Sequence, residues 1–128
     1  MKKKELPRLT PPEFEIMNAV WQAGELTITE IMNAINARRQ KKLKRTTIQV
    51  QVTRLEEKGW LVHRDDEKGY LFKGTVQRQE AATAIVRDIG ERVFGGSCFE
   101  LVKSFFNGSA VSPEEIKKLR ELLDKHEE

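Results

Sequence analysis

The segment RRQKKLKR, residues 38–45, contains six arginine or lysine side chains and no acidic one. It leads directly into an expected helix over residues 46–58, and the N-terminal amides of a helix also favour anions. Cationic side chains beside such amides are suited to holding phosphate groups. The segment therefore indicates a polyanionic partner, with a solvated basic loop as the plain alternative.

The expected helix over residues 46–58 has two different faces. Ile48, Val52 and Leu55 repeat at helical spacing and are expected to face inward. The opposite face can read base edges, because arginine pairs with guanine, glutamine with adenine, and a methyl-bearing side chain meets the thymine methyl. The candidate base-contacting residues are Thr46, Gln49, Val50, Thr53 and Arg54.

Five short motifs predict where helices begin. In each, Ser or Thr precedes Glu or Gln by three positions, so that side-chain oxygens can satisfy the first backbone donors of a helix. The first three motifs predict helices over residues 11–23, 28–37 and 46–58. The five pairs are Thr10 with Glu13, Thr27 with Glu30, Thr46 with Gln49, Ser97 with Glu100, and Ser112 with Glu115.

After Gly59 the apolar period changes from about 3.6 to about 2. WLVHR and YLFKG are strand-like runs joined by the polar turn DDEKG, which predicts a β-hairpin. Three helices followed by a hairpin is the layout of a winged helix-turn-helix, in which the third helix recognises DNA and the hairpin is the wing. The residues expected to contact phosphate are Arg38, Arg39, Lys41, Lys42, Lys44, Arg45, Thr47, Arg64 and Lys68.

Length and charge limit the organisation of the chain. At 128 residues, 38% hydrophobic and 34% charged, it suits one domain with a core or a small domain with an appendage. Residues 1–75 hold 15 Lys/Arg against 10 Asp/Glu (+5), while residues 76–128 hold 8 against 10 (−2). We therefore expect a winged-helix DNA-binding domain over 1–75 and a helical dimerisation domain over 76–128. The expected fold class is mainly α with a small β-hairpin.

The sequence gives no sign of a membrane segment. No apolar run approaches the roughly 18 residues that cross a bilayer, and the N-terminal segment lacks the apolar core of a signal peptide. We expect a cytoplasmic protein without membrane contact. Cys98 is the single cysteine, and beside Phe99 it is expected to be a small buried hydrophobic residue rather than a redox-sensing thiol.

Three helical segments after residue 76 carry more apolar side chains than about 50 residues can bury among themselves. We expect a homodimer in which these helices of two chains pack together. The alternative is that they pack back on the winged domain of the same chain. The residues expected at the dimer interface are Ile85, Ile89, Phe99, Val102, Phe105, Phe106, Ile116, Leu119, Leu122 and Leu123.

The residue types needed for catalysis are scattered along the chain. His63 falls in an expected strand and His126 lies near the C-terminus, and neither has a Cys or His neighbour at metal-ligand spacing. We therefore expect no enzyme activity, no metal and no cofactor, and we interpret His63 as a wing residue.

Three segments together resemble the penicillinase-repressor family of bacterial transcription factors, the BlaI/MecI type. They are EFEIMNAVWQAGELTITEIMNAI, TTIQVQVTRLEEKGWL and FELVKSFFNGSAVSPEEIKKLRELL, and the resemblance runs from about Leu9 to Leu123. It implies a dimeric winged-helix repressor of a palindromic operator, with a role in antibiotic resistance.

The resemblance also implies a release mechanism. Family members are cleaved by a sensor-linked protease at an Asn-Phe bond in the dimerisation domain, and the matching position in this chain is Ser104-Phe105. The phenylalanine is kept and the asparagine is not. Copper-responsive relatives carry a cysteine-rich metal motif, whereas this chain has only Cys98.

Two other binding functions fit the same layout. The first is a winged-helix regulator that responds to a small molecule held by its dimer. The second is a winged-helix adaptor that binds only protein. Failure to bind duplex DNA at low salt would support the adaptor.

Overall fold

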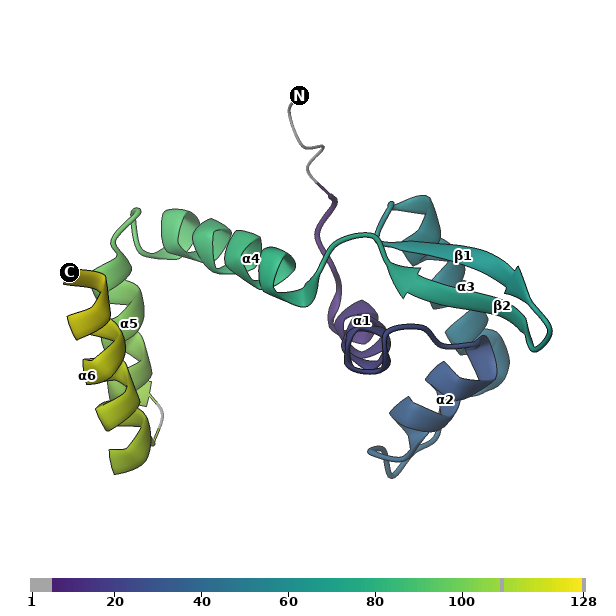
Figure 1. Ribbon diagram of the computed structural model, residues 1–128, viewed down its shortest axis with the longest axis horizontal. Coiled ribbons are helices and arrows are strands. Elements are labelled where there is room, and N and C mark those ends of the chain that lie inside the picture. The colour runs from purple at the N-terminus through teal and green to yellow at the C-terminus, as the bar shows by residue number, and fades with distance from the viewer. Residues whose placement is uncertain (1–5, 109, 128) are drawn as a thin grey trace. The chain divides into compact units, whose positions relative to one another are not determined.

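The computed structural model describes residues 6–108 and 110–127 of the chain. The expected fold class is confirmed, since the chain is mainly helical with one antiparallel hairpin (Figure 1). The elements are α1 Pro11–Ala23, α2 Ile28–Asn36, α3 Arg45–Glu57, β1 Leu61–Asp66, β2 Gly69–Gly74, α4 Arg78–Val93, α5 Cys98–Gly108 and α6 Pro113–Glu127.

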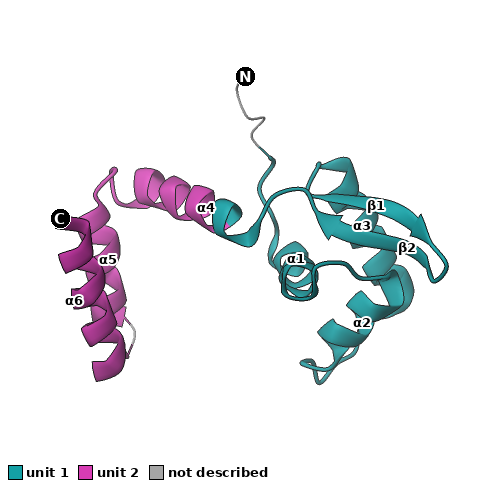
Figure 2. Ribbon diagram, in the orientation of Figure 1, with its two compact units in different colours: residues 1–81 teal, residues 82–128 magenta. Residues whose placement is uncertain are grey.

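The chain forms two compact units, residues 1–81 and residues 82–128 (Figure 2). The division falls beyond the boundary expected after Thr75, because the first turn of α4 belongs to the first unit. Ala81 is only 3% exposed and packs in the core of that unit.

Four of the five predicted helix starts have at least one of the two expected hydrogen bonds, and α2 has both. At α2 the Glu30 amide donates to Thr27 Oγ1 at 3.2 Å, and the Thr27 amide donates to Glu30 Oε1 at 2.9 Å. At α1 the Thr10 amide donates to Glu13 Oε1 at 2.8 Å. At α5 and α6 the hydroxyls of Ser97 and Ser112 each accept at 3.1 Å from the backbone amides of Glu100 and Glu115.

The prediction that Thr46 and Gln49 cap the third helix is wrong. Helix α3 begins at Arg45 with Lys44 as its N-cap, and no side-chain hydrogen bond caps it. The reason is that Lys44 is extended (φ −78°, ψ 153°) and its carbonyl accepts from the Ile48 amide at 3.2 Å. Thr46 therefore lies inside the first turn, where it cannot act as the N-cap.

The first unit has a single apolar core. The predicted inward stripe of α3 is confirmed, since Ile48, Val52 and Leu55 are at most 1% exposed. They pack with residues of α1, α2, the hairpin, the residue before it and the start of α4: Ile16, Met17, Val20, Ile31, Ile35, Trp60, Leu61, Phe72 and Ala81. Burial of one face of each helix fixes which face of α3 remains outside.

The hairpin pairs β1 and β2 antiparallel, from Leu61 opposite Gly74 to Asp66 opposite Gly69. Leu26 pairs with the other edge of β2, because its amide donates to the Phe72 carbonyl at 3.0 Å and its carbonyl accepts from the Phe72 amide at 2.8 Å. The segment between α1 and α2 thus anchors the hairpin to the three-helix core.

The described residues of the second unit form no core of this kind. Gly95 and Gly96 follow α4 with positive φ, and the Gly96 amide donates to the Gly90 carbonyl at 2.8 Å, which ends the helix. Helices α5 and α6 contain no buried residue in the part of the chain that the structure describes. Within the same residues, none of the helices has the length and apolar character needed to cross a membrane.

Candidate nucleic-acid interface

The outer face of α3 carries all five side chains that the sequence assigned to base contact. Thr46, Gln49, Val50, Thr53 and Arg54 are exposed, and Val50 is 50% exposed even though it is apolar. Half of the surface of this apolar side chain is therefore open to a partner. Base contact by these residues stays a prediction, whereas their shared position on one face is a finding.

For two of these side chains, the contacts within the chain indicate which groups are left to bind a partner. The Thr53 hydroxyl donates to the Gln49 backbone carbonyl at 2.9 Å, so its methyl group is left for apolar contact. Arg54 makes no ion pair within residues 6–108 and 110–127. Its guanidinium can therefore donate two parallel hydrogen bonds to an external acceptor such as guanine.

The loop between α2 and α3, residues 37–44, displays most of the predicted phosphate contacts. Arg38, Lys41, Lys42 and Lys44 are exposed. Arg39 differs from them, because its Nη1 lies 3.3 Å from Glu15 Oε1 and its Nε donates to the Lys41 carbonyl at 3.1 Å. Arg39 thus holds the loop to α1. Its ion pair with Glu15 competes with phosphate for the same guanidinium.

In the wing, Arg64 is engaged by a carboxylate. Its Nε and Nη2 donate to the two oxygens of Glu25 at 2.9 and 3.2 Å. The hydrogen bond from Arg64 lowers the pKa of Glu25, and the same bond raises the pKa of Arg64. This pair ties β1 to the segment between α1 and α2, so Arg64 has a structural partner that the sequence did not indicate.

Lys68 lies in the wing turn. It lines a shallow cleft of about 380 Å³ that also contains Arg45 and Gln49. The cleft brings together residues from three elements that the sequence separates: Thr27, Ile28, Thr29, Glu30, Arg45, Gln49, Lys68, Gly69 and Tyr70. Two cations and an amide at one concave surface suit a nucleic-acid backbone beside a base edge.

Sequence reasoning missed Tyr70, which is 55% exposed at this cleft. Its ring centroid lies 4.5 Å from that of His63, and His63 Nδ1 hydrogen bonds with Glu56 of α3. His63 is therefore a wing residue as predicted, and it links the wing to α3. An aromatic side chain directly after the turn glycine was the signal that could have found Tyr70.

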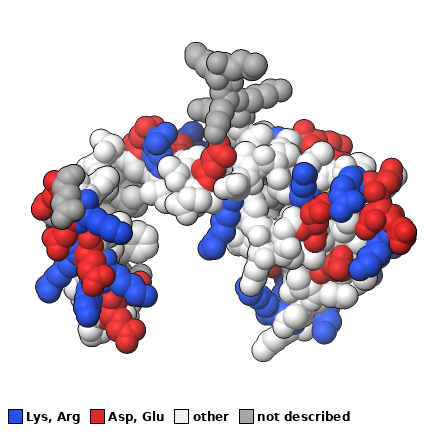
Figure 3. Space-filling model, viewed as in Figure 1, with Lys and Arg blue, Asp and Glu red and all other residues white. Residues whose placement is uncertain are grey.

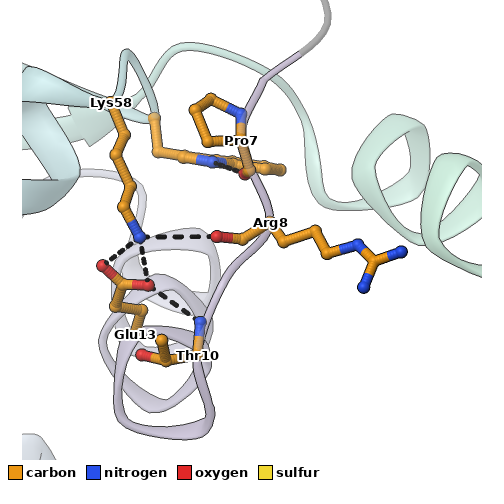
Figure 4. Close-up of polar contacts among 6 residues, drawn as sticks. Pro7, Arg8, Thr10, Glu13 and Lys58 are labelled. Carbon is orange, nitrogen blue, oxygen red and sulfur yellow. Dashed lines mark hydrogen bonds and ion pairs between the residues drawn. The ribbon is translucent and has the colours of Figure 1, made fainter.

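The C-terminal end of α3 is held by a buried ion pair with α1 (Figure 4). Lys58 Nζ lies 2.8 and 2.9 Å from the two carboxylate oxygens of Glu13, which is 1% exposed. Burial acts to raise the pKa of Glu13, but the hydrogen bonds from Lys58 and Thr10 outweigh it and lower the pKa. The same lysine donates to the Arg8 carbonyl at 3.4 Å, and Trp60 Nε1 donates to the Pro7 carbonyl at 2.7 Å.

Charge is distributed unevenly over this unit. Acidic and basic side chains mix over the hairpin region in Figure 3. The tip of the hairpin contains Asp65, Asp66 and Glu67 beside Lys68, whereas loop residues 37–44 contain five cations and no acid. The loop between α2 and α3 is thus the more strongly cationic of the two edges next to α3.

Most of the predicted interface residues of the second unit are exposed in the described part of the chain. Seven are exposed, namely Ile89, Phe99, Val102, Phe105, Phe106, Leu122 and Leu123. Ile85, Ile116 and Leu119 are half-buried. Ser104 and Phe105 are both exposed on α5.

The expectation that Cys98 is buried is wrong for the single chain, because the thiol is exposed at the first position of α5. Its neighbour Phe99 is also exposed, at 71%. Among the described residues, no group of three or more His, Cys, Asp or Glu side chains could hold a metal ion.

Three packed helices, a hairpin anchored along one edge, and a third helix with an exposed outer face define a winged helix-turn-helix protein. Residues 9–125 match the sequence model of a family described as "Penicillinase repressor". The chain therefore belongs to the penicillinase-repressor family, as the resemblance predicted.

Similar proteins are known in several bacteria. The penicillinase repressor of Bacillus licheniformis is 23% identical over 123 residues, which cover 96% of this chain and 94% of that protein. The methicillin resistance regulatory protein MecI of Staphylococcus aureus (strain N315) is 26% identical over 117 residues, 91% of this chain and 94% of that protein.

Two solved structures share the fold. One is the monomeric form of Bacillus licheniformis BlaI in complex with the blaP half-operator, with a TM-score of 0.51 and 20% identity over 61% of this chain and 93% of that one. The other is a MarR family protein from Bacillus stearothermophilus, with a TM-score of 0.52 and 23% identity over 93% of this chain and 73% of that one.

Proposed function

We propose that this chain is a DNA-binding transcriptional repressor that binds a palindromic operator as a homodimer in the cytoplasm. The observation that carries the proposal is the outer face of α3, where five exposed side chains able to contact bases lie beside an exposed basic loop. In this arrangement the loop contacts phosphates and fixes the register, while α3 reads the bases.

The relatives support the repressor part of the proposal. They are named as repressors and regulatory proteins of penicillinase or methicillin resistance, and the BlaI structure contains a half-operator. These functions are binding functions and not enzymatic ones. Control of a resistance gene is the corresponding role for this chain.

The homodimer part rests on the second unit. Phe99, Phe105 and Leu122 are 71%, 59% and 63% exposed, and side chains of this size in contact with water favour association. A symmetric dimer places two copies of α3 at two half-sites, which is why the operator is proposed to be palindromic.

Release by a sensor-linked protease is the least supported part of the family pattern in this chain. The matching bond, Ser104-Phe105, has serine in place of asparagine, and it lies within α5. A protease needs an extended segment, so the helix must open locally before cleavage. An unchanged intact mass of the chain recovered from β-lactam-treated cells would exclude cleavage as the release signal.

A small-molecule-responsive regulator remains the alternative of similar architecture. The likeness to a MarR family protein is at 23% identity and shows the fold alone. Binding of an effector to the dimer would have to weaken operator binding for this alternative to hold.

The test is selection of bound duplexes from a random pool with the purified full-length chain at two salt concentrations. Recovery of an inverted repeat that survives the higher salt supports a sequence-specific dimeric repressor. Recovery of salt-sensitive binding without a motif rejects sequence-specific binding, because phosphate contacts alone lose affinity steeply with salt. No binding at low salt would favour the protein-only adaptor.

A further inference from the structure

The two ends of the basic loop are joined by a pair of hydrogen bonds from one side chain. Asn36, the last residue of α2, donates through Nδ2 to the Leu43 carbonyl at 3.0 Å. Its Oδ1 accepts from the Leu43 amide at 2.8 Å. The amide thus replaces the hydrogen bonds that two neighbouring strands would make, and it closes residues 37–42 into a ring. We call this pair of bonds the Asn36 clasp.

The clasp holds the loop to the core. Leu43 is half-buried and packs against the apolar core of the first unit. Asn36 itself is half-buried at the end of a helix whose Ile35 is only 5% exposed. Both ends of the clasp are therefore attached to packed elements, and the residues between them have no apolar anchor of their own.

A second contact restrains the middle of the loop. The Arg39 guanidinium bridges the Lys41 carbonyl inside the ring and the Glu15 carboxylate on α1. Lys41 and Lys42 lie inside the ring, and Lys44 follows it directly. All three side chains are exposed and make no ion pair within the described residues.

We propose that Asn36 is a positioning residue for phosphate contact, and that its clasp orders the basic loop before DNA arrives. This inference rests on the proposed DNA-binding function and adds to it a residue that acts by holding the loop. Without the clasp, the loop samples many arrangements, and ordering it during binding costs conformational entropy. On average about one phosphate contact per copy is then not made, which weakens the complex and lowers its salt dependence.

The experiment compares Asn36→Ala with Asn33→Ala in the full-length protein. Asn33 lies one turn earlier on α2, is exposed, and makes no side-chain hydrogen bond among the described residues. Affinities are measured for the selected inverted repeat and for a random duplex from 50 to 200 mM salt. Asn36→Ala is expected to weaken both duplexes by about five- to tenfold, and Asn33→Ala by less than about twofold.

Two readouts separate positioning from a general loss of structure. Phosphate contacts carry no sequence information, so a disordered loop weakens both duplexes alike and reduces the salt slope by about one for each bound copy. In the DNA-free protein, the Leu43 amide should exchange its proton about tenfold faster in Asn36→Ala, while the Ile48 amide of α3 keeps its protection.

The outcomes distinguish this inference from the proposed function. Absence of binding by the wild type overturns both. Normal wild-type binding with Asn36→Ala equal to Asn33→Ala overturns only the role of Asn36. A loss confined to the inverted repeat with an unchanged salt slope also overturns it, because that result locates the damage in α3.

A second pair of variants tests the same inference if Asn36→Ala folds poorly. Asn36→Asp keeps the acceptor for the Leu43 amide and removes the donor to the Leu43 carbonyl, and Asn33→Asp is its charge-matched control. Weaker binding by Asn36→Asp than by Asn33→Asp on both duplexes supports the clasp. Equal binding by the two contradicts it.

Discussion

Both units of the chain contain several helices, but the two units differ in what these helices bury. In the first unit, α1, α2, α3 and the hairpin cover one another, and side chains such as Ile48 and Leu55 are fully buried. In the second unit, α5 and α6 bury no residue among those described, and Leu122 and Leu123 are each 63% exposed. Burial on one face of each element is what makes a unit stable alone.

Ionic contacts show the same difference. The pair of Glu13 with Lys58 is buried on the carboxylate side and joins residues 45 positions apart. The pair of Asp88 with Arg92 in α4 spans one helical turn, and both side chains are largely exposed. A buried pair depends on tertiary structure, whereas a pair within one helix forms wherever that helix forms. The first unit is thus complete in one chain, and the second has apolar surface that a second copy can cover.

The largest expected effect is on association through the second unit. Leu119→Asp places a carboxylate in the apolar face of α6, which should raise the dimer dissociation constant by at least about 100-fold. Sedimentation over a range of concentrations measures it, with Lys118→Asp on the polar face as the control. If the wild type sediments as a monomer, or if Leu119→Asp stays dimeric, the apolar face of α6 is not the dimer interface.

The next effect tests whether the first unit is stable by itself. Leu55→Ala opens a cavity in its core and should cost about 2–5 kcal/mol of unfolding free energy. Both tryptophans, Trp21 and Trp60, lie in this unit, so urea unfolding followed by tryptophan fluorescence reports on it alone. Leu122→Ala, the same substitution at an exposed site of the second unit, should leave this midpoint unchanged. Equal shifts for the two variants would mean that the units unfold as one.

A smaller effect is expected from the buried ion pair. Lys58→Met removes the cation from Glu13 and should cost about 2 kcal/mol, less than for a fully buried pair because the Lys58 side chain is 30% exposed. Because folding lowers the pKa of Glu13, its carboxylate stabilises the fold above the unfolded pKa of about 4.3. That contribution is lost as pH falls through the folded pKa.

The stability gap between wild type and Lys58→Met should therefore be widest near pH 7 and narrow as pH falls below about 4. Urea unfolding at several pH values measures the gap. Arg92→Met is the matched control, since it breaks the exposed pair in α4 and should show no comparable gap. A gap that stays constant down to pH 3 contradicts the role given to the Glu13 carboxylate.

What could be predicted from the sequence was local in origin. The stripe of Ile48, Val52 and Leu55 fixed the outer face of α3, because helical period alone decides which residues share a face. The helix starts at Thr27 and Ser112 were predictable for the same reason, since their hydrogen bonds join residues three apart.

The features that the sequence did not predict depend on residues far apart. The partner of Arg64 is Glu25, 39 positions away, and no periodic pattern links the two. Glu13 was identified as part of a capping motif, which does not indicate that its carboxylate is buried against Lys58. The wrong prediction that Thr46 caps α3 has the same origin. The Asn36 clasp holds Leu43, and the next residue, Lys44, is extended and acts as the N-cap of α3. At Cys98, the apolar neighbours predicted burial that a single chain does not provide.

Within the first unit, α3 and the basic loop should respond differently to substitution. Arg54→Ala should cost about 1–3 kcal/mol on the selected operator and relax the choice of one base, because a bidentate contact with a base edge is lost. Binding to a random duplex should change little. Competition between operators that differ at single positions measures the effect. Equal losses on specific and random duplexes would assign Arg54 to phosphate instead.

The smallest expected effect is that of a single phosphate contact, and it also tests whether the second unit joins two copies. Lys42→Ala removes one phosphate contact per chain and should weaken every duplex alike, reducing the salt slope by about one for each copy on the DNA. On a half-site duplex that holds one copy, the salt slope should fall by about one. If the second unit joins two copies, the salt slope on the full inverted repeat should fall by about two. Titration from 50 to 200 mM salt gives both slopes. The same fall on both duplexes would show that one copy binds at a time, which contradicts the dimer even if the contact by Lys42 is correct.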